Sequence, residues 1–427
     1  MSSPPLTSVS TNNRRETLVW RYIYLSTLLG VFSGAAKLSV GFSLQIFDIV
    51  MIVNLALMAS CISIPRWVAW LALCLSASGA LGILRGTDTF PLFLKEFLGI
   101  TVSAIYFATF FRHFRRNLDR VFLTYAKIAY WETVIGILMF LGEYLHTNRY
   151  ARMQGLFSEP MHYCLLVLPA YYWFAYLCFT LRKCIREFSV ISVGMCLAGS
   201  SVGFIGIAFG ILLLLSRRRR AVILGPLIVG LFIFVIYTLS PTVRIRVDDT
   251  MAAATTLDVS GSNASTYALI SNIVVTQNVM QVHPVLGNGL GSNVLSHDRY
   301  LYNVLGVDEF INSGIGSLNS ADADSLVLRS LSELGLVGLI GILWFVFHFR
   351  VSGDGVRAAI SSAILVGFSV RLLRHGHYFQ PEQFFYIQMY ISNYQQARRE
   401  GLTHANRFNL RWTSHTRRVP EVAQGTN

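Results

Sequence analysis

Long apolar stretches alternate with short polar links along most of this chain. The stretches lie at about residues 18–36, 41–62, 66–84, 90–111, 121–143, 161–181, 190–215, 221–240, 326–349, 355–373 and 378–396. Most are close to the roughly 20 apolar residues that a helix needs to cross a bilayer. The stretch 190–215 is broken at Gly199-Ser200-Ser201, which predicts two short spans that meet at the outer face. The pattern predicts an all-α, polytopic transmembrane bundle of about 12 spans.

One long polar interval interrupts this pattern between residues 241 and 325. Within it, residues 267–282 carry apolar side chains at helical spacing and predict a helix that lies over the bundle. The predicted organisation is an N-terminal tail (1–17), about nine spans (18–240), one large loop (241–325), about three spans (326–396) and a C-terminal tail (397–427).

Composition and charge agree with a membrane protein. Hydrophobic residues make up 53% of the 427 residues and charged residues only 13%, against roughly 25% charged in soluble domains. The net charge of +13 comes from arginines and lysines that cluster between spans, so it reflects the positive-inside rule rather than nucleic-acid binding. This charge pattern predicts that both termini are cytoplasmic and the large loop is outside. No cleavable signal peptide is evident.

The cysteines indicate neither a disulfide framework nor a zinc site. All six lie in apolar spans or at their ends, and none is in the large loop. We therefore expect no metal and no cofactor.

Two carboxylates near the end of the polar interval are candidate catalytic groups. Asp324 either caps the following helix or acts as a general base at the outer membrane face. Glu333 lies nine residues further on, roughly 13 Å along the helix axis. Arg329 is placed to pair with it, so Glu333 forms a structural ion pair or takes part in chemistry. In either case it should not face lipid.

Arginines on the predicted outer side are candidate ligands for a diphosphate, because a guanidinium group binds phosphate oxygens in a bidentate manner. The alternative is that they anchor lipid headgroups. The candidates are Arg149, Arg152, Arg244, Arg246, Arg299, Arg371 and Arg374.

A glycine-rich segment follows the predicted loop helix. His283-Pro284 precedes Gly287, Gly289 and Gly291. Such a segment forms either a nest of N–H groups that binds an anion or a compact turn that closes the loop helix. It is not a nucleotide-binding P-loop, since the Gly-Lys-Ser/Thr ending is absent.

Taken together, these motifs resemble the O-antigen polymerase and O-antigen ligase superfamily of bacterial envelope polysaccharide enzymes. The resemblance covers about residues 145–345 and is carried by segments 152–160, 199–201, 283–291 and 325–335. Ligases of this family typically have a His-Asn pair where this chain has Asp324-Ser325. The arginines usual after the serine between the short spans and before the loop helix are absent, near Ser201 and Thr266. These departures favour a repeat-unit polymerase over a ligase.

The resemblance implies glycosyl transfer between glycans carried on undecaprenyl diphosphate, at the periplasmic face of the inner membrane. Asp324 would deprotonate the acceptor hydroxyl, and outer arginines such as Arg152 and Arg299 would neutralise the leaving diphosphate. The implied partners are the lipid-linked glycans, membrane lipid, and a chain-length regulator and flippase of the same pathway. From these candidates we select Asp324 and Glu333 for catalysis, and Arg152, Arg299, Arg244, His283, Gly287 and Gly289 for diphosphate binding.

Two alternatives remain at this point. One is an O-antigen ligase, and the other is a transporter or flippase of polysaccharide or lipid-linked sugar. A transporter predicts internal repeats and ionisable residues near the bilayer midplane. No tandem repeat is evident in the sequence.

Overall fold

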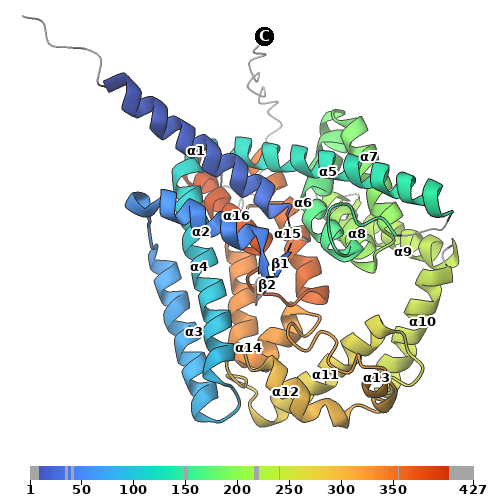
Figure 1. Ribbon diagram of the computed structural model, residues 1–427. Coiled ribbons are helices and arrows are strands. Elements are labelled where there is room, and N and C mark those ends of the chain that lie inside the picture. The colour runs from blue at the N-terminus through green and yellow to red at the C-terminus, as the bar shows by residue number, and fades with distance from the viewer. Residues whose placement is uncertain are drawn as a thin grey trace, which may run out of the picture.

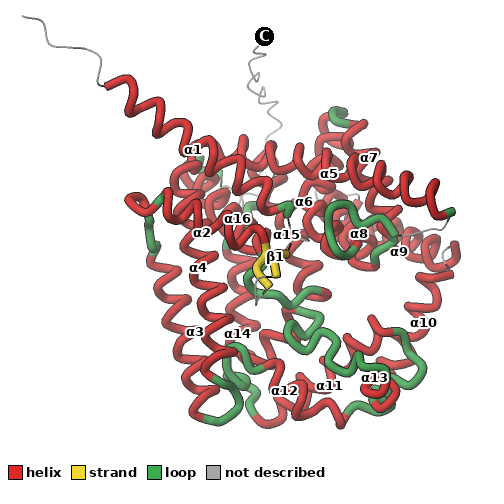
Figure 2. The backbone as a smooth tube through the Cα atoms, in the orientation of Figure 1, coloured by secondary structure: helices red, strands yellow, loops and turns green. Residues whose placement is uncertain are grey.

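The computed structural model describes residues 9–33, 37–39, 43–148, 152–215, 221–239, 241–353 and 355–402 (Figure 1). Most of them are helical (Figure 2). The helices are α1 (Val9–Val31), α2 (Ile46–Leu57), α3 (Arg66–Leu84), α4 (Phe90–Phe114), α5 (Leu118–Thr147), α6 (Pro160–Leu181), α7 (Ile185–Ala198), α8 (Ser201–Leu215), α9 (Ala221–Leu239), α10 (Pro241–Thr256), α11 (Ala264–Val282), α12 (Asn293–Tyr300), α13 (Asp308–Asn312), α14 (Leu326–His348), α15 (Val356–Arg374) and α16 (Pro381–Arg399). Strands β1 (Lys37–Ser39) and β2 (Ser43–Gln45) form an antiparallel pair, and 3-10 turns occur at Ala59–Cys61, Arg115–Asn117 and Leu301–Asn303.

The apolar stretches predict the helices well, but a count of about 12 spans is not confirmed. Five segments of the described chain are long and apolar enough to cross a membrane: Arg66–Leu84, Phe90–Thr147, Pro160–Leu181, Leu326–His348 and Val356–Arg374. A sixth exists if Pro226–Leu239 and Val243–Thr256, which are bent by 106° relative to each other, are one span.

The missing spans have a physical explanation. Helices α2, α7 and α8 contain 12, 14 and 15 residues, which corresponds to about 18–23 Å at the rise of an α-helix. The hydrocarbon core is roughly 30 Å thick. In α16, polar side chains are interspersed along the helix, and its last turn holds Arg398 and Arg399. The described chain is therefore a helical, multi-pass type of membrane protein with fewer full-length spans than the sequence pattern predicts.

The centre of the bundle and its outer helices differ in burial. Helices α6 and α15 pack against each other and also contact α8, and nearly all of the α6 segment Tyr163–Tyr176 is buried. Helices α3 and α14 instead expose large apolar side chains, such as Trp70 (65% exposed), Ile340 (62%) and Phe347 (66%). Exposed apolar surface of this extent fits contact with lipid rather than with water.

The polar interval is not an irregular loop. It contains α10 to α13, and α11 includes the predicted helix 267–282. Helices α11, α12 and α13 lie at the opposite end of the molecule from α1 (Figure 1). The N-terminal boundary also differs from the prediction, because α1 begins at Val9, inside the predicted tail 1–17. Residues 1–8 and 403–427, which hold much of the predicted tails, lie outside the described residues.

Candidate functional site

Asp324 lies in a tight turn immediately before α14. Ser325, rather than Asp324, caps the helix through its side-chain oxygen, which accepts a hydrogen bond from the N–H of Leu328. The capping interpretation of Asp324 is therefore wrong. Asp324 adopts a left-handed conformation (φ 56°), which costs free energy for a residue with a Cβ atom. The described partners of its carboxylate lie elsewhere than in the first turn of α14, where Leu328 N–H donates to Ser325.

The partners of the Asp324 carboxylate come from a different part of the chain. Its Oδ2 atom lies 2.8 Å from Nη1 of Arg374, the last residue of α15. Its Oδ1 atom accepts a hydrogen bond from the Asn319 amide (3.0 Å). The carboxylate is almost entirely buried, and only 4% of the residue is exposed. Asp324 is thus held between two polar groups in a place that excludes most water.

Burial changes the protonation of this carboxyl group. It raises the pKa of Asp324 to about 7, against the lowering effect of the Arg374 charge. The negative charge of Asp322 raises the pKa further, and the Asn319 hydrogen bond lowers it. A carboxyl group with a pKa near neutrality exchanges protons readily at physiological pH, as a general base requires.

The link after α15 approaches this turn so closely that only glycine fits at position 376. A Cβ atom on Gly376 would lie 1.6 Å from the carbonyl oxygen of Asp322. The approach brings the His377 ring to 3.1 Å from the Asp322 carboxylate. Burial lowers the pKa of His377, although Asp322 opposes this effect, and the side chain remains 39% exposed. Asp322, Asp324 and His377 therefore lie at one corner of the bundle.

Three arginines gather at the same corner. Burial lowers the pKa of Arg246 on α10, and the positive charges of Arg152 and Arg374 lower it further. Arg374 also donates a hydrogen bond to the Ser265 hydroxyl on α11 (2.7 Å). Arg152 donates to the carbonyl oxygens of Ala198 and Gly199 at the end of α7 (3.2 and 3.1 Å). These carbonyl contacts fix Arg152 without neutralising its charge. The cluster of Arg152, Arg246 and Arg374 holds three positive charges, and among the described residues only that of Arg374 has a carboxylate partner, Asp324.

Glu333 takes part in a buried ion triad. Its Oε1 atom lies 3.1 Å from Nε of Arg329, and Nη2 of the same arginine lies 2.8 Å from the Glu96 carboxylate on α4. The Arg329 guanidinium stacks over the Tyr378 ring at 4.3 Å and donates to the carbonyl oxygen of Gly376 (3.2 Å). Glu333 is fully buried, as expected for a group that should not face lipid. The geometry favours the structural ion pair, with the triad supporting the link that carries His377.

Helix α14 is broken at Gly335, whose φ and ψ are 64° and −160°. A break leaves backbone N–H and C=O groups without helical partners, and such groups are costly inside a membrane protein unless another segment binds them. Here the segment Pro284–Gly289 provides the partners through backbone hydrogen bonds. The bonds join Asn288 N to Ser332 O (2.9 Å), Gly289 N to Glu333 O (2.9 Å), Leu336 N to Pro284 O (3.0 Å) and Val337 N to Val285 O (3.2 Å).

This pairing accounts for the glycines. A Cβ atom on Gly287 would lie 2.6 Å from the carbonyl carbon of Glu333, and its N–H donates to the carbonyl of His283 (3.0 Å). Gly289 has a positive φ of 107° and lies against the backbone of Gly82. Because the N–H groups of both glycines bind protein carbonyls, the geometry favours the compact turn over an anion nest. His283 itself caps the end of α11 and is partly buried, and burial lowers its pKa.

Two predicted arginines lie outside the cluster, and a third, Arg149, lies outside the described residues. Arg244 is exposed and pairs loosely with Asp248 at 4.0 Å. Arg299, near the end of α12, is exposed, and no ion pair of Arg299 occurs among the described residues. Neither arginine contacts Asp324. The structure thus separates Arg152, Arg246 and Arg374 from these two.

Sequence reasoning listed Arg371 as a candidate diphosphate ligand but missed the polar residues around it. Arg371 binds the Glu382 carboxylate at 2.6 Å, and the His375 ring packs between His162 and His377. The signal was the density of ionisable and aromatic residues in the short link 371–382 between two apolar stretches. Asp322, two residues before Asp324, gave a similar signal.

No group of three or more histidine, cysteine, aspartate or glutamate side chains in the described residues is arranged to hold a metal ion. Comparisons with protein-family models, with curated proteins and with solved structures found no match to this chain.

Proposed function

We propose that this protein is a membrane glycosyltransferase that polymerises oligosaccharide repeat units carried on undecaprenyl diphosphate. The reaction would take place at the periplasmic face of a bacterial inner membrane, with both termini in the cytoplasm. One observation carries the proposal: the buried carboxylate of Asp324 lies next to Arg374, within a cluster of three arginines. The sequence resemblance to O-antigen polymerases supports the same assignment.

The arginine cluster suits a leaving diphosphate. Guanidinium groups bind phosphate oxygens in a bidentate manner and remain charged at any physiological pH. Arg152, Arg246 and Arg374 come from three separate segments, so a ligand that bridges them would relieve their mutual repulsion. Stabilising the charge that develops on the leaving group is commonly a large contribution to catalysis.

Asp324 suits the role of general base. In the proposed reaction, a hydroxyl oxygen of one lipid-linked repeat unit attacks the anomeric carbon of the growing chain. The hydroxyl proton moves to the Asp324 carboxylate, and the bond between the anomeric carbon and the diphosphate breaks. The diphosphate leaves with the bonding electron pair and is held by the arginines. Asp324 is ionised in part at neutral pH, since its pKa is about 7.

The test compares arginines inside and outside the cluster in a strain that lacks the native copy. We expect Arg374→Gln and Arg246→Gln to abolish polymer, while Arg244→Gln and Arg299→Gln retain it. Each of the four variants replaces one arginine and removes one positive charge. The last two are therefore matched controls for the loss of charge. Polymer is measured by gel and mass analysis of lipid-linked glycans. Wild-type polymer in both cluster variants would contradict the assignment.

The same analysis separates the alternative functions through the glycans that accumulate without the protein. Single repeat units that accumulate on the lipid carrier indicate a polymerase. Long chains that remain unattached indicate a ligase, and loss of outward-facing repeat units indicates a flippase. Asp324→Asn is expected to give the first pattern with normal amounts of protein in the membrane.

A further inference from the structure

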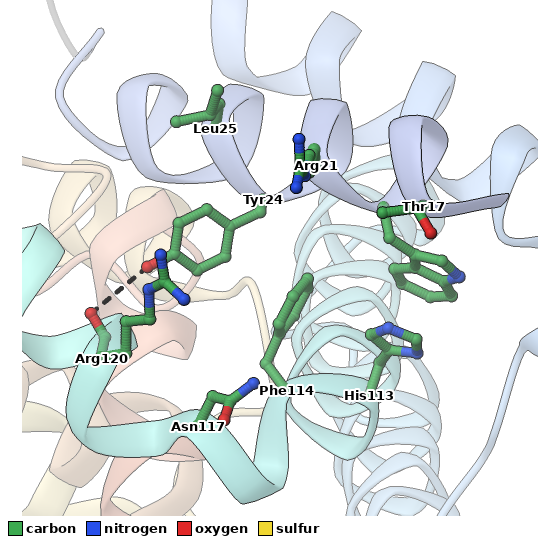
Figure 3. A pocket seen from close by; sticks show the side chains of 9 residues that line it. Thr17, Arg21, Tyr24, Leu25, His113, Phe114, Asn117 and Arg120 are labelled. Atoms are coloured by element: carbon green, nitrogen blue, oxygen red, sulfur yellow. Dashed lines mark hydrogen bonds between the residues drawn. The ribbon is translucent and has the colours of Figure 1, made fainter. Parts of the chain in front are cut away.

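A surface groove of about 740 Å³ lies between α1 and the turn that joins α4 to α5 (Figure 3). Its position is at the α1 end of the molecule, opposite the end that holds α11 to α13 (Figure 1). It is therefore distinct from the site of Asp324. The volume is within the range of roughly 300–1,000 Å³ that is typical of small-molecule and cofactor sites.

The groove is positively charged. Among the described residues that line it are Arg21 and Arg120, and no carboxylate. Both arginines are exposed, and neither forms an ion pair within the described part of the chain. The carboxylate next to Arg120 in the sequence, Asp119, pairs with Arg357. Among the side chains that the structure describes, the two guanidinium groups thus have no negative partner.

The rest of the groove is aromatic and apolar. Trp20 stacks on His113 with ring centroids 3.5 Å apart, and Tyr24 packs against Phe114 at 5.1 Å. Figure 3 shows the Tyr24 ring beside Arg120, where its hydroxyl donates to the carbonyl oxygen of that residue. Rings with a polar edge favour the boundary between hydrocarbon and headgroups.

Further apolar surface connects the groove to the membrane-facing part of the protein. Leu25, which lines the groove on α1, is 53% exposed, and Leu29 one turn further along the helix is 58% exposed. The turn between α4 and α5 belongs to the apolar segment Phe90–Thr147, which is long and apolar enough to cross a membrane. A ligand here would have an anionic end at the arginines and an apolar end along α1.

We propose that this groove binds an anionic phospholipid, with its phosphate held by Arg21 and Arg120. The acyl chains extend along the exposed leucines of α1, and the aromatic rings pack against the glycerol region. The two ends of this chain are not anionic overall, because residues 1–16 contain two arginines and one glutamate, and residues 403–427 contain four arginines and one glutamate. The proposal does not depend on the glycosyltransferase function.

The experiment titrates the purified full-length protein with phosphatidylglycerol in detergent and counts bound lipid by native mass spectrometry. Each basic residue near an anionic surface contributes about 1 kcal/mol, so loss of both charges in Arg21→Gln/Arg120→Gln is expected to weaken binding about 30-fold. The matched control is Arg112→Gln/Arg116→Gln, which removes two exposed charges outside the groove lining, one from the end of α4 and one from the turn that follows it. This control is expected to bind as the wild type does.

Three results would overturn the proposal. One is an equal loss of binding in the two double variants, which would mean that diffuse charge attracts the lipid. Another is equal affinity for phosphatidylcholine, which would remove the role of the net negative headgroup. The third is competition by millimolar inorganic phosphate that displaces phosphatidylglycerol completely, which would mean that the groove takes phosphate without the lipid. Thermal unfolding of both variants checks that they remain folded.

Discussion

Replacing Gly287 by alanine tests the pairing between the segment Pro284–Gly289 and the broken helix α14. Gly287 has a φ of 62°, and a Cβ atom there would lie 2.6–2.7 Å from backbone atoms of Glu333 and Gly335. Backbone atoms on both sides cannot move away without breaking the hydrogen bonds that bridge the break in the helix. The variant should therefore lose more stability than its left-handed conformation alone would explain.

The structure provides the control that isolates the steric part of this effect. Gly86, in the turn between α3 and α4, has nearly the same φ of 66°, but no atom lies within 4 Å of a Cβ atom placed there. Gly86→Ala should cost about 1–2 kcal/mol for the left-handed conformation. Gly287→Ala should cost that amount and a further 1–3 kcal/mol, approximately, for overpacking.

The measurement is the free energy of unfolding of both variants and the wild type in mixed micelles with increasing sodium dodecyl sulfate, followed by circular dichroism. We expect Gly287→Ala to be less stable than Gly86→Ala by about 1–3 kcal/mol. Two variants of equal stability would refute the close backbone pairing. Gly287→Ala should also lower polymer yield, because the pairing includes the carbonyl of Glu333, a member of the buried triad.

Three further predictions concern charge. Transfer activity should rise with pH through about 7, as the Asp324 carboxyl ionises. Asn319→Ala should move this rise to higher pH, because the Asn319 hydrogen bond lowers the pKa of Asp324; a pH-rate profile that is the same in both proteins would contradict this. Because the pKa of Asp324 is higher in the folded protein than in the unfolded chain, the protonated group favours the folded state. This contribution to the free energy of unfolding is complete below the unfolded-state pKa and is lost as pH rises through about 7. Asp324→Asn should therefore make the free energy of unfolding fall less steeply over this pH range. Arg329→Met should destabilise the fold by about 3–5 kcal/mol, since it leaves the buried carboxylates of Glu333 and Glu96 without a positive partner. Adding Glu333→Gln to Arg329→Met should restore part of this loss of stability. A double variant that is no more stable than Arg329→Met would argue against the triad.

The sequence predicted the positions of the helices closely. The stretch expected at 66–84 is α3, Arg66–Leu84, and the break expected at residues 199–201 separates α7 from α8. Both features depend on local composition, because a run of apolar residues favours helix in a membrane and glycine ends it. The pairing of Arg329 with Glu333 was also predictable, since the two lie one helical turn apart.

Other features depend on contacts between segments that are far apart in the chain. Nothing local to α14 indicates that Glu96 on α4 completes the triad, or that Pro284–Gly289 binds the backbone at its break. The same holds for the predicted outer arginines, because the sequence alone does not show which of them lie close together. Only the fold brings Arg246 into the field of Arg152 and Arg374 and leaves Arg299 exposed.

The sequence by itself determined a helical membrane protein with one long polar interval, because hydrophobicity and glycine act over a few residues. The tertiary structure decided how many helices are long enough to span, which carboxylate is available for chemistry, and which arginines surround it. Those outcomes depend on burial and on charges that meet across the bundle. The pKa of Asp324 is one example, since it reflects the exclusion of water around the turn together with Arg374 from a separate helix.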